Sequence, residues 1–184
     1  TYLFGRQNLP FELAEKVTKL IATNIPVRGD YDHDILLYYT SISLAAETWP
    51  EMTSQQWFNG KSSSQNFKEA RDYLNTWIQS TVKHGQIEYD SPQFMPNFFA
   101  AFALLHEFTR DDALRKSLKV VLNLIMLDFA SEHLDGIYAG AHSRIQKEQI
   151  MSPRDALSAG FSWSYFGSGR MIPSSEFLFA SLSS

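Results

Sequence analysis

Residues 85–144 read GQIEYDSPQFMPNFFAAFALLHEFTRDDALRKSLKVVLNLIMLDFASEHLDGIYAGAHSR. Two apolar runs flank the charged turn TRDD at 109–112, which predicts two antiparallel helices joined by a short turn. The outer segments of such a hairpin return to the same end of the pair. They contain side chains that can transfer protons or bind anionic groups, namely Glu88, Tyr89, Tyr138, His142 and Arg144. The stretch therefore predicts an apolar helical hairpin with a chemically capable end.

Three further helices are predicted ahead of this hairpin. Apolar residues recur at helical spacing over about 10–24, 31–48 and 65–84, and the third of these segments has the clearest periodicity. Gly85 follows that third segment directly, as a glycine that ends a helix does. No stretch alternates apolar and polar residues cleanly over six positions, as a half-buried strand would. The predicted fold class is therefore all-α.

Helix direction predicts where the polar segments lie. If consecutive helices run up and down, the start of the helix at 31–48, the end of the helix at 65–84 and the outer ends of the hairpin share one face. Segments 30–34, 83–91 and 133–144 should therefore converge. Helical hairpins of this kind, with no repeat of fixed period, predict part or all of an (α/α) toroid rather than a regular helical array.

A chain of 184 residues predicts one helical domain over 1–184, with a less regular C-terminal segment over 145–184. In that segment we expect a short helix that Gly160 ends and an irregular aromatic stretch over 161–173.

Neither helix of the central hairpin has a clear polar face across 98–105 and 120–130, so we expect both to be buried on most sides. Five helices would cover them poorly. The chain also begins with Thr1 and ends in the apolar run FLFASLSS. We therefore expect it to be a fragment of a larger toroid, with further domains of a longer parent chain as its partners.

Composition narrows the class of function. A net charge of -4 gives no basic footprint, which argues against nucleic acid as a partner. The absence of cysteine excludes thiolate catalysis and Cys-ligated zinc. Charged residues interrupt every apolar run, so no membrane span is predicted. Because the sequence has no P-loop, GxGxxG, GxSxG or HExxH motif, we expect neither a cofactor nor a metal site.

Three segments carry a resemblance to a known family: DYDHDILLYYTSISLAAETWP at 30–50, KHGQIEYDSPQF at 83–94, and LLHEFTRDDALRKSLKVVLNLIMLDFASEHLDGIYAGAHSR at 104–144. Their order resembles the (α/α)-toroid domains of bacterial polysaccharide lyases, including heparinase- and alginate-lyase-like proteins, and related uncharacterised bacterial toroid proteins. The resemblance implies a toroid fold, a polysaccharide or oligosaccharide partner, and a periplasmic or secreted location.

In that family an Asn-His element opens a helix, and His and Tyr residues act in β-elimination next to a uronic acid. Asp32 and His33 lie where this element would lie, with Asp in place of the Asn that helps to neutralise the substrate carboxylate. The aromatic residue that follows the Ser-Pro element is Phe94, which has no hydroxyl to exchange a proton. Both departures favour the alternative of a non-catalytic helical module that binds a glycan or a protein.

The converging segments offer every group that elimination from a uronate needs, which are a base, an acid and a cation. His33 or His142 could be the base, Tyr138 or Tyr89 the acid, and Arg144 the carboxylate clamp. The two histidines and the arginine also have structural alternatives. Arg144 could form a salt bridge or cap a helix, His33 could bond to backbone at a helix start, and His142 could be a surface histidine.

Glu88 is either an acid–base group or a structural residue. Partial burial would raise its pKa and suit it to proton transfer. Alternatively it bonds backbone N–H groups or Arg144 and so holds the loops together. The pairs Asp32/Glu88 and Asp34/Glu88 also permit glycoside hydrolysis by two carboxylates.

Substrate contacts are predicted at aromatic and acidic positions. An aromatic content of 14% is rich, and aromatic rings line sugar-binding grooves as well as cores. We expect Trp57 and Trp163 to stack on sugar rings, with Asp32 and Tyr89 beside them. Trp77 fits the core-facing spacing of its helix.

Overall fold

The computed structural model describes residues 5, 8–24 and 28–171, which form helices and one two-stranded sheet. The all-α prediction is thus confirmed. The first helices are α2 (Phe11–Thr23), α3 (Asp32–Thr48), α4 (Ser63–His84), α5 (Met95–Phe108) and α6 (Asp112–Glu132). They are followed by β1 (His133–Leu134), β2 (Ile137–Tyr138), α7 (Lys147–Met151), the 3-10 helix η2 (Pro153–Asp155) and α8 (Leu157–Phe166).

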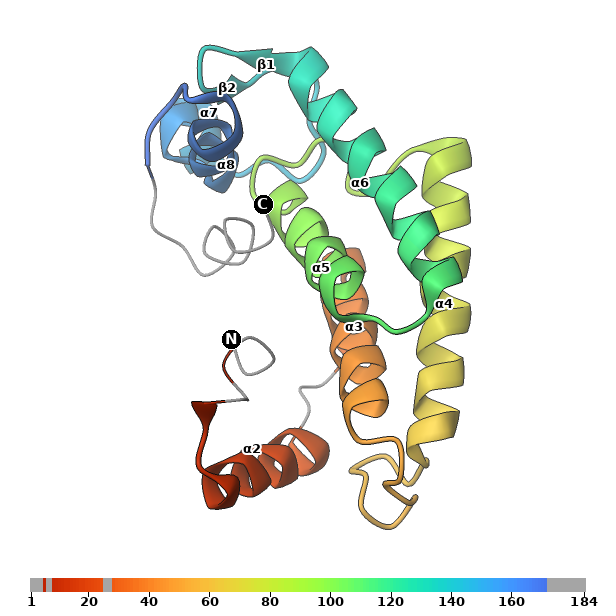
Figure 1. The fold of residues 1–184 in the computed structure, drawn as a ribbon. Helices are drawn as coiled ribbons and strands as arrows, with labels where there is room; N and C mark the ends of the chain where they lie inside the picture. The colour runs from red at the N-terminus through yellow and green to blue at the C-terminus, as the bar shows by residue number, and fades with distance from the viewer. Residues whose placement is uncertain (1–4, 6–7, 25–27, 172–184) are drawn as a thin grey trace.

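Two helical hairpins, α3–α4 and α5–α6, form the body of the molecule (Figure 1). Helix α3 also packs on α5, and α4 packs on α6. The two hairpins run in the same direction, because Glu47 at the end of α3 accepts hydrogen bonds from Thr109 and Arg110 at the end of α5. The result is two layers, with α3 and α5 in one and α4 and α6 in the other.

Helix α5 is the most deeply buried element, as its sequence predicted. Its Phe98 and Phe102 side chains have no exposed surface, because α3, α6 and α8 all pack against the helix. Trp77 of α4 lies 5.6 Å from the Phe98 ring and 5.0 Å from the Phe102 ring, between ring centroids. Trp77 therefore belongs to the core, as expected from its spacing.

Helix α6 differs from the prediction of burial on most sides. One stripe of the helix is buried, and its residues recur every three or four positions: Leu114, Leu118, Val121, Ile125 and Phe129. The opposite face is open, with Val120 55% exposed and Leu127 69% exposed. The prediction for 120–130 was wrong because α6 lies at the edge of its layer, where α4 and α5 cover only one side.

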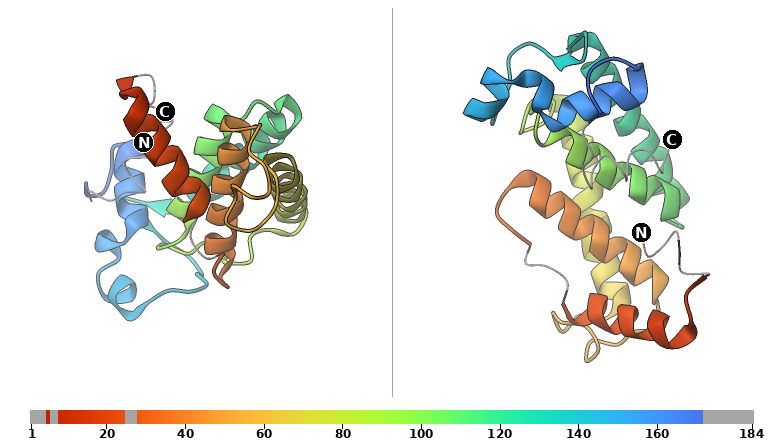
Figure 2. Two further views of the ribbon diagram at one scale, coloured as in Figure 1. Left: turned by 90° about the horizontal axis from the view of Figure 1, so that it is seen from below. Right: turned by 90° about the vertical axis from the view of Figure 1, so that its left-hand side faces the viewer.

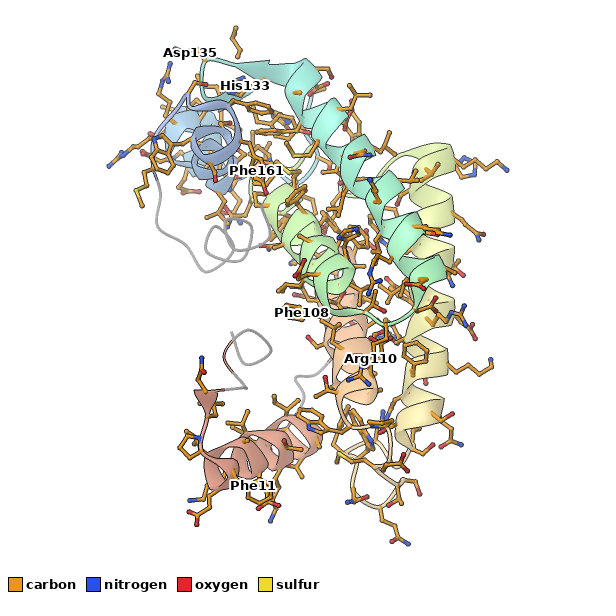
Figure 3. The ribbon with its side chains drawn as sticks, in the orientation of Figure 1. Phe11, Phe108, Arg110, His133, Asp135 and Phe161 are labelled. Atoms are coloured by element: carbon orange, nitrogen blue, oxygen red, sulfur yellow. The ribbon has the colours of Figure 1, made fainter. Side chains whose placement is uncertain are left out.

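The C-terminal segment is more regular than predicted. Helix α8 continues through Gly160 and ends at Gly167, which adopts the left-handed conformation with φ 67°. Tertiary packing explains the continuation, since the Phe161 ring lies 4.9 Å from Phe99 and 5.2 Å from Phe129 (Figure 3). The part of the expected irregular stretch beyond residue 171 lies outside the described residues, as does the FLFASLSS run.

A small hairpin that the sequence reasoning missed follows α6. Strands β1 and β2 pair antiparallel, with His133 opposite Tyr138. Asp135 and Gly136 between them have φ values of 46° and 79°, the positive values that a two-residue hairpin turn requires. A Cβ atom at Gly136 would lie 2.1 Å from Gly169 Cα, so glycine is also required for this close approach. The hairpin turns Tyr138 inward.

Helix α2 lies at the far end of the molecule from α7 and α8 (Figures 1 and 2). It contacts the connector between α3 and α4, where Phe58 N donates to Ala22 O at 3.1 Å. Its Phe11 and Leu20 side chains are 75% and 60% exposed. No helix in the described ranges is long and apolar enough to span a membrane.

We predict that two leucines of α6 differ sharply in their contribution to stability. Leu118→Ala removes a side chain with no exposed surface and should lower the free energy of unfolding by about 2–5 kcal/mol. Leu127→Ala, at a 69% exposed position of the same helix, should change it by less than about 0.5 kcal/mol. Urea unfolding followed by circular dichroism measures both. Equal losses would mean that the outer face of α6 is covered in solution.

Candidate functional site

Glu88 joins the three polar segments that helix direction predicted to converge. Its side chain is almost fully buried, at 3% exposure. Oε2 lies 2.9 Å from His33 Nδ1 at the start of α3, and Oε1 lies 3.0 Å from Arg144 Nη1 in the loop after β2. We call the surface made by residues 30–34, 85–91 and 138–144 the rim. The predicted convergence is therefore confirmed.

Local backbone geometry holds the two loops of the rim in place. Gly85, with φ 83°, ends α4 and lets the chain turn toward Glu88. Ser143 then ties the loops together, because its backbone N–H and its hydroxyl both donate to Tyr89 O at 2.9 Å. The next residue, Arg144, has a positive φ of 49°. This conformation, which is uncommon for a non-glycine residue, brings the guanidinium to Glu88.

His33 is held by a carboxylate and by an aromatic ring. Its imidazole stacks on Phe94, with 4.0 Å between ring centroids and 16° between the planes. Because Nδ1 faces Glu88, Nε2 is the ring nitrogen on the other side, 3.4 Å from Asp34 Oδ1. The structural alternative of a bond to backbone is replaced by this bond to a buried carboxylate. Nε2 is thus the ring nitrogen that does not contact Glu88, and its nearest charged neighbour is the carboxylate of Asp34.

Arg144 contributes more than charge to the rim. Its guanidinium carbon lies 4.1 Å from the centre of the Tyr31 ring and 5.1 Å from that of Phe94. Its ion pair with Glu88 matches the structural alternative for both residues. Phe94 therefore supports the imidazole and the guanidinium together, a role that needs no hydroxyl.

Asp32 faces α4 rather than the centre of the rim. Both of its carboxylate oxygens accept from Trp77 Nε1, at 3.0 and 3.1 Å. Burial raises the pKa of Asp32, and the hydrogen bond from Trp77 acts in the opposite direction. The carboxylate therefore connects α3 to α4. Asp32 is the residue that the lyase-like resemblance places beside the substrate, and its carboxylate is bound to Trp77 instead.

A second polar cluster, which the sequence reasoning did not foresee, lies on the α6 side of the same turn. Asp90 is 1% exposed and accepts a hydrogen bond from the buried hydroxyl of Tyr138. Burial is the main cause that raises the pKa of Tyr138, and the hydrogen bond and charge of Asp90 raise it further. Its proton is thus held within the protein. The cluster also includes Asp128 and Glu132 of α6. Their i, i+4 spacing was the only sequence signal for it.

Two further side chains complete the Asp90 cluster. Burial raises the pKa of Asp128 to about 7, and a hydrogen bond to Asp90 and the charges of Asp90 and Glu132 act in the same direction. Tyr89, 42% exposed, lies with its hydroxyl 3.4 Å from Glu132 Oε1. The hydrogen bond and charge of Asp90 are the main causes that raise the pKa of that hydroxyl, and the charge of Glu132 raises it further. Tyr89 is therefore a partly accessible tyrosine of the rim whose hydroxyl keeps its proton.

The remaining predicted residues lie away from the Glu88 contacts. His142 Nε2 is 2.9 Å from Tyr138 O, and its ring lies against Tyr138. Trp57 was wrongly predicted as a stacking surface, because it is 4% exposed and its Nε1 donates to Ser63 Oγ at the start of α4. Trp163 is 40% exposed on α8.

Comparison of the chain with known protein families, with curated proteins and with solved structures finds no match. Within the ranges that the structure describes, no group of three or more His, Asp or Glu side chains could hold a metal ion.

We predict that Glu88→Gln lowers the free energy of unfolding by about 1–3 kcal/mol. An amide keeps the shape of the side chain but presents N–H groups to one of two donors, His33 or Arg144. Thermal and urea unfolding measure the loss. Glu107→Gln, at an exposed position of α5, is the matched control and should change stability by less than about 0.5 kcal/mol. Similar values for the two variants would show that the Glu88 contacts are weak.

The raised pKa of Asp128 predicts that the free energy of unfolding depends on pH. A carboxyl whose folded pKa is raised from 3.8 to about 7 keeps its proton in the folded state while the unfolded state loses it. The stabilisation by the protonated Asp128 is complete below pH 3.8 and is lost as the pH rises to about 7. The urea midpoint of the wild type minus that of Asp128→Asn should therefore fall over this interval. Asp112→Asn, at an exposed position of α6, is the control, and its urea midpoint should change with pH as that of the wild type does. A difference in midpoint between the wild type and Asp128→Asn that stays the same at every pH would contradict the assignment.

Proposed function

We propose that the chain is part of a helical domain of the (α/α)-toroid type, which binds an acidic polysaccharide or oligosaccharide at the rim and cleaves it by β-elimination. The observation that carries this proposal is the buried Glu88, which holds the imidazole of His33 and the guanidinium of Arg144 from two remote segments. Proton transfer next to a carboxylate needs an oriented base and a nearby cation. The rim supplies both.

The arrangement of the hairpins supports the toroid part of the proposal. In helical toroids and solenoids, successive hairpins lie side by side and point the same way, so that equivalent loops collect along one edge. The α3–α4 and α5–α6 hairpins have this relation, and the rim is the edge at which their outer segments meet. The exposed face of α6 is a surface against which a further hairpin could pack.

Aromatic side chains and a cation support an acidic sugar as the ligand. Tyr31 is 53% exposed, and the guanidinium of Arg144 lies over its ring. Tyr89 is 42% exposed on the adjoining segment. Aromatic faces stack on sugar rings, and a guanidinium pairs with a carboxylate. The side chain of Arg144 is 36% exposed, so one edge of the group can reach a ligand.

In the proposed elimination, two residues carry out the proton transfers. His33 Nε2 takes the proton on C5 of the uronate, and the electron pair of that C–H bond forms the C4–C5 double bond. The C4–O4 bond breaks, and the leaving oxygen takes a proton from the Tyr89 hydroxyl. Glu88, hydrogen-bonded to Nδ1, stabilises the imidazolium that forms. Tyr138 does not serve as the acid in this scheme, because Asp90 holds its hydroxyl in the interior.

A second candidate function is a non-catalytic binding module, and a specific observation favours it. Arg144 already pairs with Glu88, so a substrate carboxylate would have to share its charge. Hydrolysis by paired carboxylates fits less well. His33 contacts both Glu88 and Asp34 and so lies between them, and Trp77 holds Asp32.

The test is a panel of alginate, polygalacturonate and amylose, followed by the ultraviolet absorbance of an unsaturated uronate. The wild type should produce this absorbance with an acidic polymer and not with amylose. His33→Gln should lower the rate at least about 100-fold while binding persists. His84→Ala, an exposed histidine at the end of α4, is the matched control and should keep the full rate.

Three other results would change the conclusion. Binding without ultraviolet absorbance would establish the non-catalytic module. New reducing ends without that absorbance would establish hydrolysis. Failure of every acidic polymer to bind would overturn the proposal altogether.

A further inference from the structure

A cavity of about 490 Å³ lies beside the rim and contains none of the residues discussed so far. It is bounded by α7, by Ser152 and Asp155 on either side of the first residues of η2, and by Gln93 in the turn before α5. Its volume falls in the range of about 300–1,000 Å³ that is common for small-ligand sites. Gln93 directly precedes Phe94, and Gln146 follows Arg144 by two residues. Chain continuity therefore places the cavity next to the rim.

Three glutamine side chains dominate the chemistry of this cavity, which we call the glutamine pocket: Gln93, Gln146 and Gln149. Each primary amide carries two donors on nitrogen and an acceptor oxygen. Sugar hydroxyl groups also donate and accept, so an amide can contact them in either sense. The hydroxyl of Ser152 adds a fourth group of the same kind.

The amides of the glutamine pocket are fixed in position. Gln149 is 7% exposed; its Nε2 donates to Gln93 Oε1 at 2.7 Å, and its Oε1 accepts from Gln146 N at 2.9 Å. The side chain of Gln146 in turn accepts from the backbone N–H of Gln149. These bonds occupy only one of the two N–H groups on Gln149 Nε2 and the oxygen of Gln93, so donors remain for a ligand. Polar groups held in this way bind with a small loss of conformational entropy.

The charges around the glutamine pocket balance. Lys147 and Glu148 carry opposite charges. Asp155 is already paired, since its Oδ1 lies 2.7 Å from Arg170 Nη1. No net charge selects an ion, whereas the amides and the serine select a polar, uncharged ligand.

We propose that the glutamine pocket is a subsite for an uncharged, hydroxyl-rich sugar residue of a glycan whose acidic residue lies at the rim. The inference deepens the proposed function and rests on it for the identity of the ligand as a glycan. It predicts that a chain in which an uncharged sugar stands next to a uronate binds more tightly than a polymer of uronates alone.

The test uses the whole chain with neutral tetrasaccharides of glucose and of mannose as probes, and with oligogalacturonate as the acidic probe. Chemical-shift titration should detect binding of a neutral probe at residues of the glutamine pocket. Gln93→Ala and Gln149→Ala should each weaken this binding about tenfold, which corresponds to the loss of one or two hydrogen bonds. Gln93 is only partly buried, so its variant keeps the test valid if Gln149→Ala does not fold.

Two controls separate the glutamine pocket from the rim. Gln79→Ala, an exposed glutamine on α4, should leave binding of the neutral probe unchanged. His33→Gln should also leave it unchanged, because His33 does not line the pocket. Neutral probes that do not bind, or that bind equally well to both pocket variants, would overturn the subsite. Binding of oligogalacturonate in that case would leave the proposed function standing, and its absence would remove the proposed function independently.

Discussion

The buried carboxylate of Glu88 is the interaction on which the rest of the rim depends. A carboxylate at 3% exposure is costly unless its oxygens find strong donors, and each oxygen of Glu88 has one. The two donors come from the start of α3 and from the loop after β2, which are more than a hundred residues apart in the chain. One side chain thus fixes the position of three segments that no regular hydrogen-bond ladder connects.

The hairpin stack explains why such a residue can exist. Helices α3 and α5 start at the same end because their hairpins point the same way, so polar residues that precede each helix meet above a largely apolar interior. Phe94 lies beneath these polar residues, and its ring contacts both the imidazole of His33 and the guanidinium of Arg144. An aromatic floor of this kind excludes water from one side of the charges, which strengthens their interaction with Glu88.

The sequence predicted those features that depend on local pattern. Helix α4 was placed within two residues because its apolar spacing is regular and Gly85 marks its end. The convergence of His33, Glu88 and Arg144 also followed, since short turns leave consecutive helices little choice of direction.

Features set by tertiary packing escaped prediction. The burial of α6 depends on its place at the edge of a layer, and α8 extends past Gly160 because Phe161 packs on two other rings. The burial of Trp57 depends on where the connector after α3 folds back, which no spacing encodes. The Asp90 cluster depends on which way alternate side chains of one short turn point.

That turn, residues 85–91, distributes its side chains between two neighbours. Glu88 reaches toward α3, and Asp90, two positions later, reaches toward Tyr138 at the end of β2. Inserting or deleting one residue between them would move one of the two carboxylates away from its partner. The length of this turn is consequently as strictly constrained as the identity of its acidic residues.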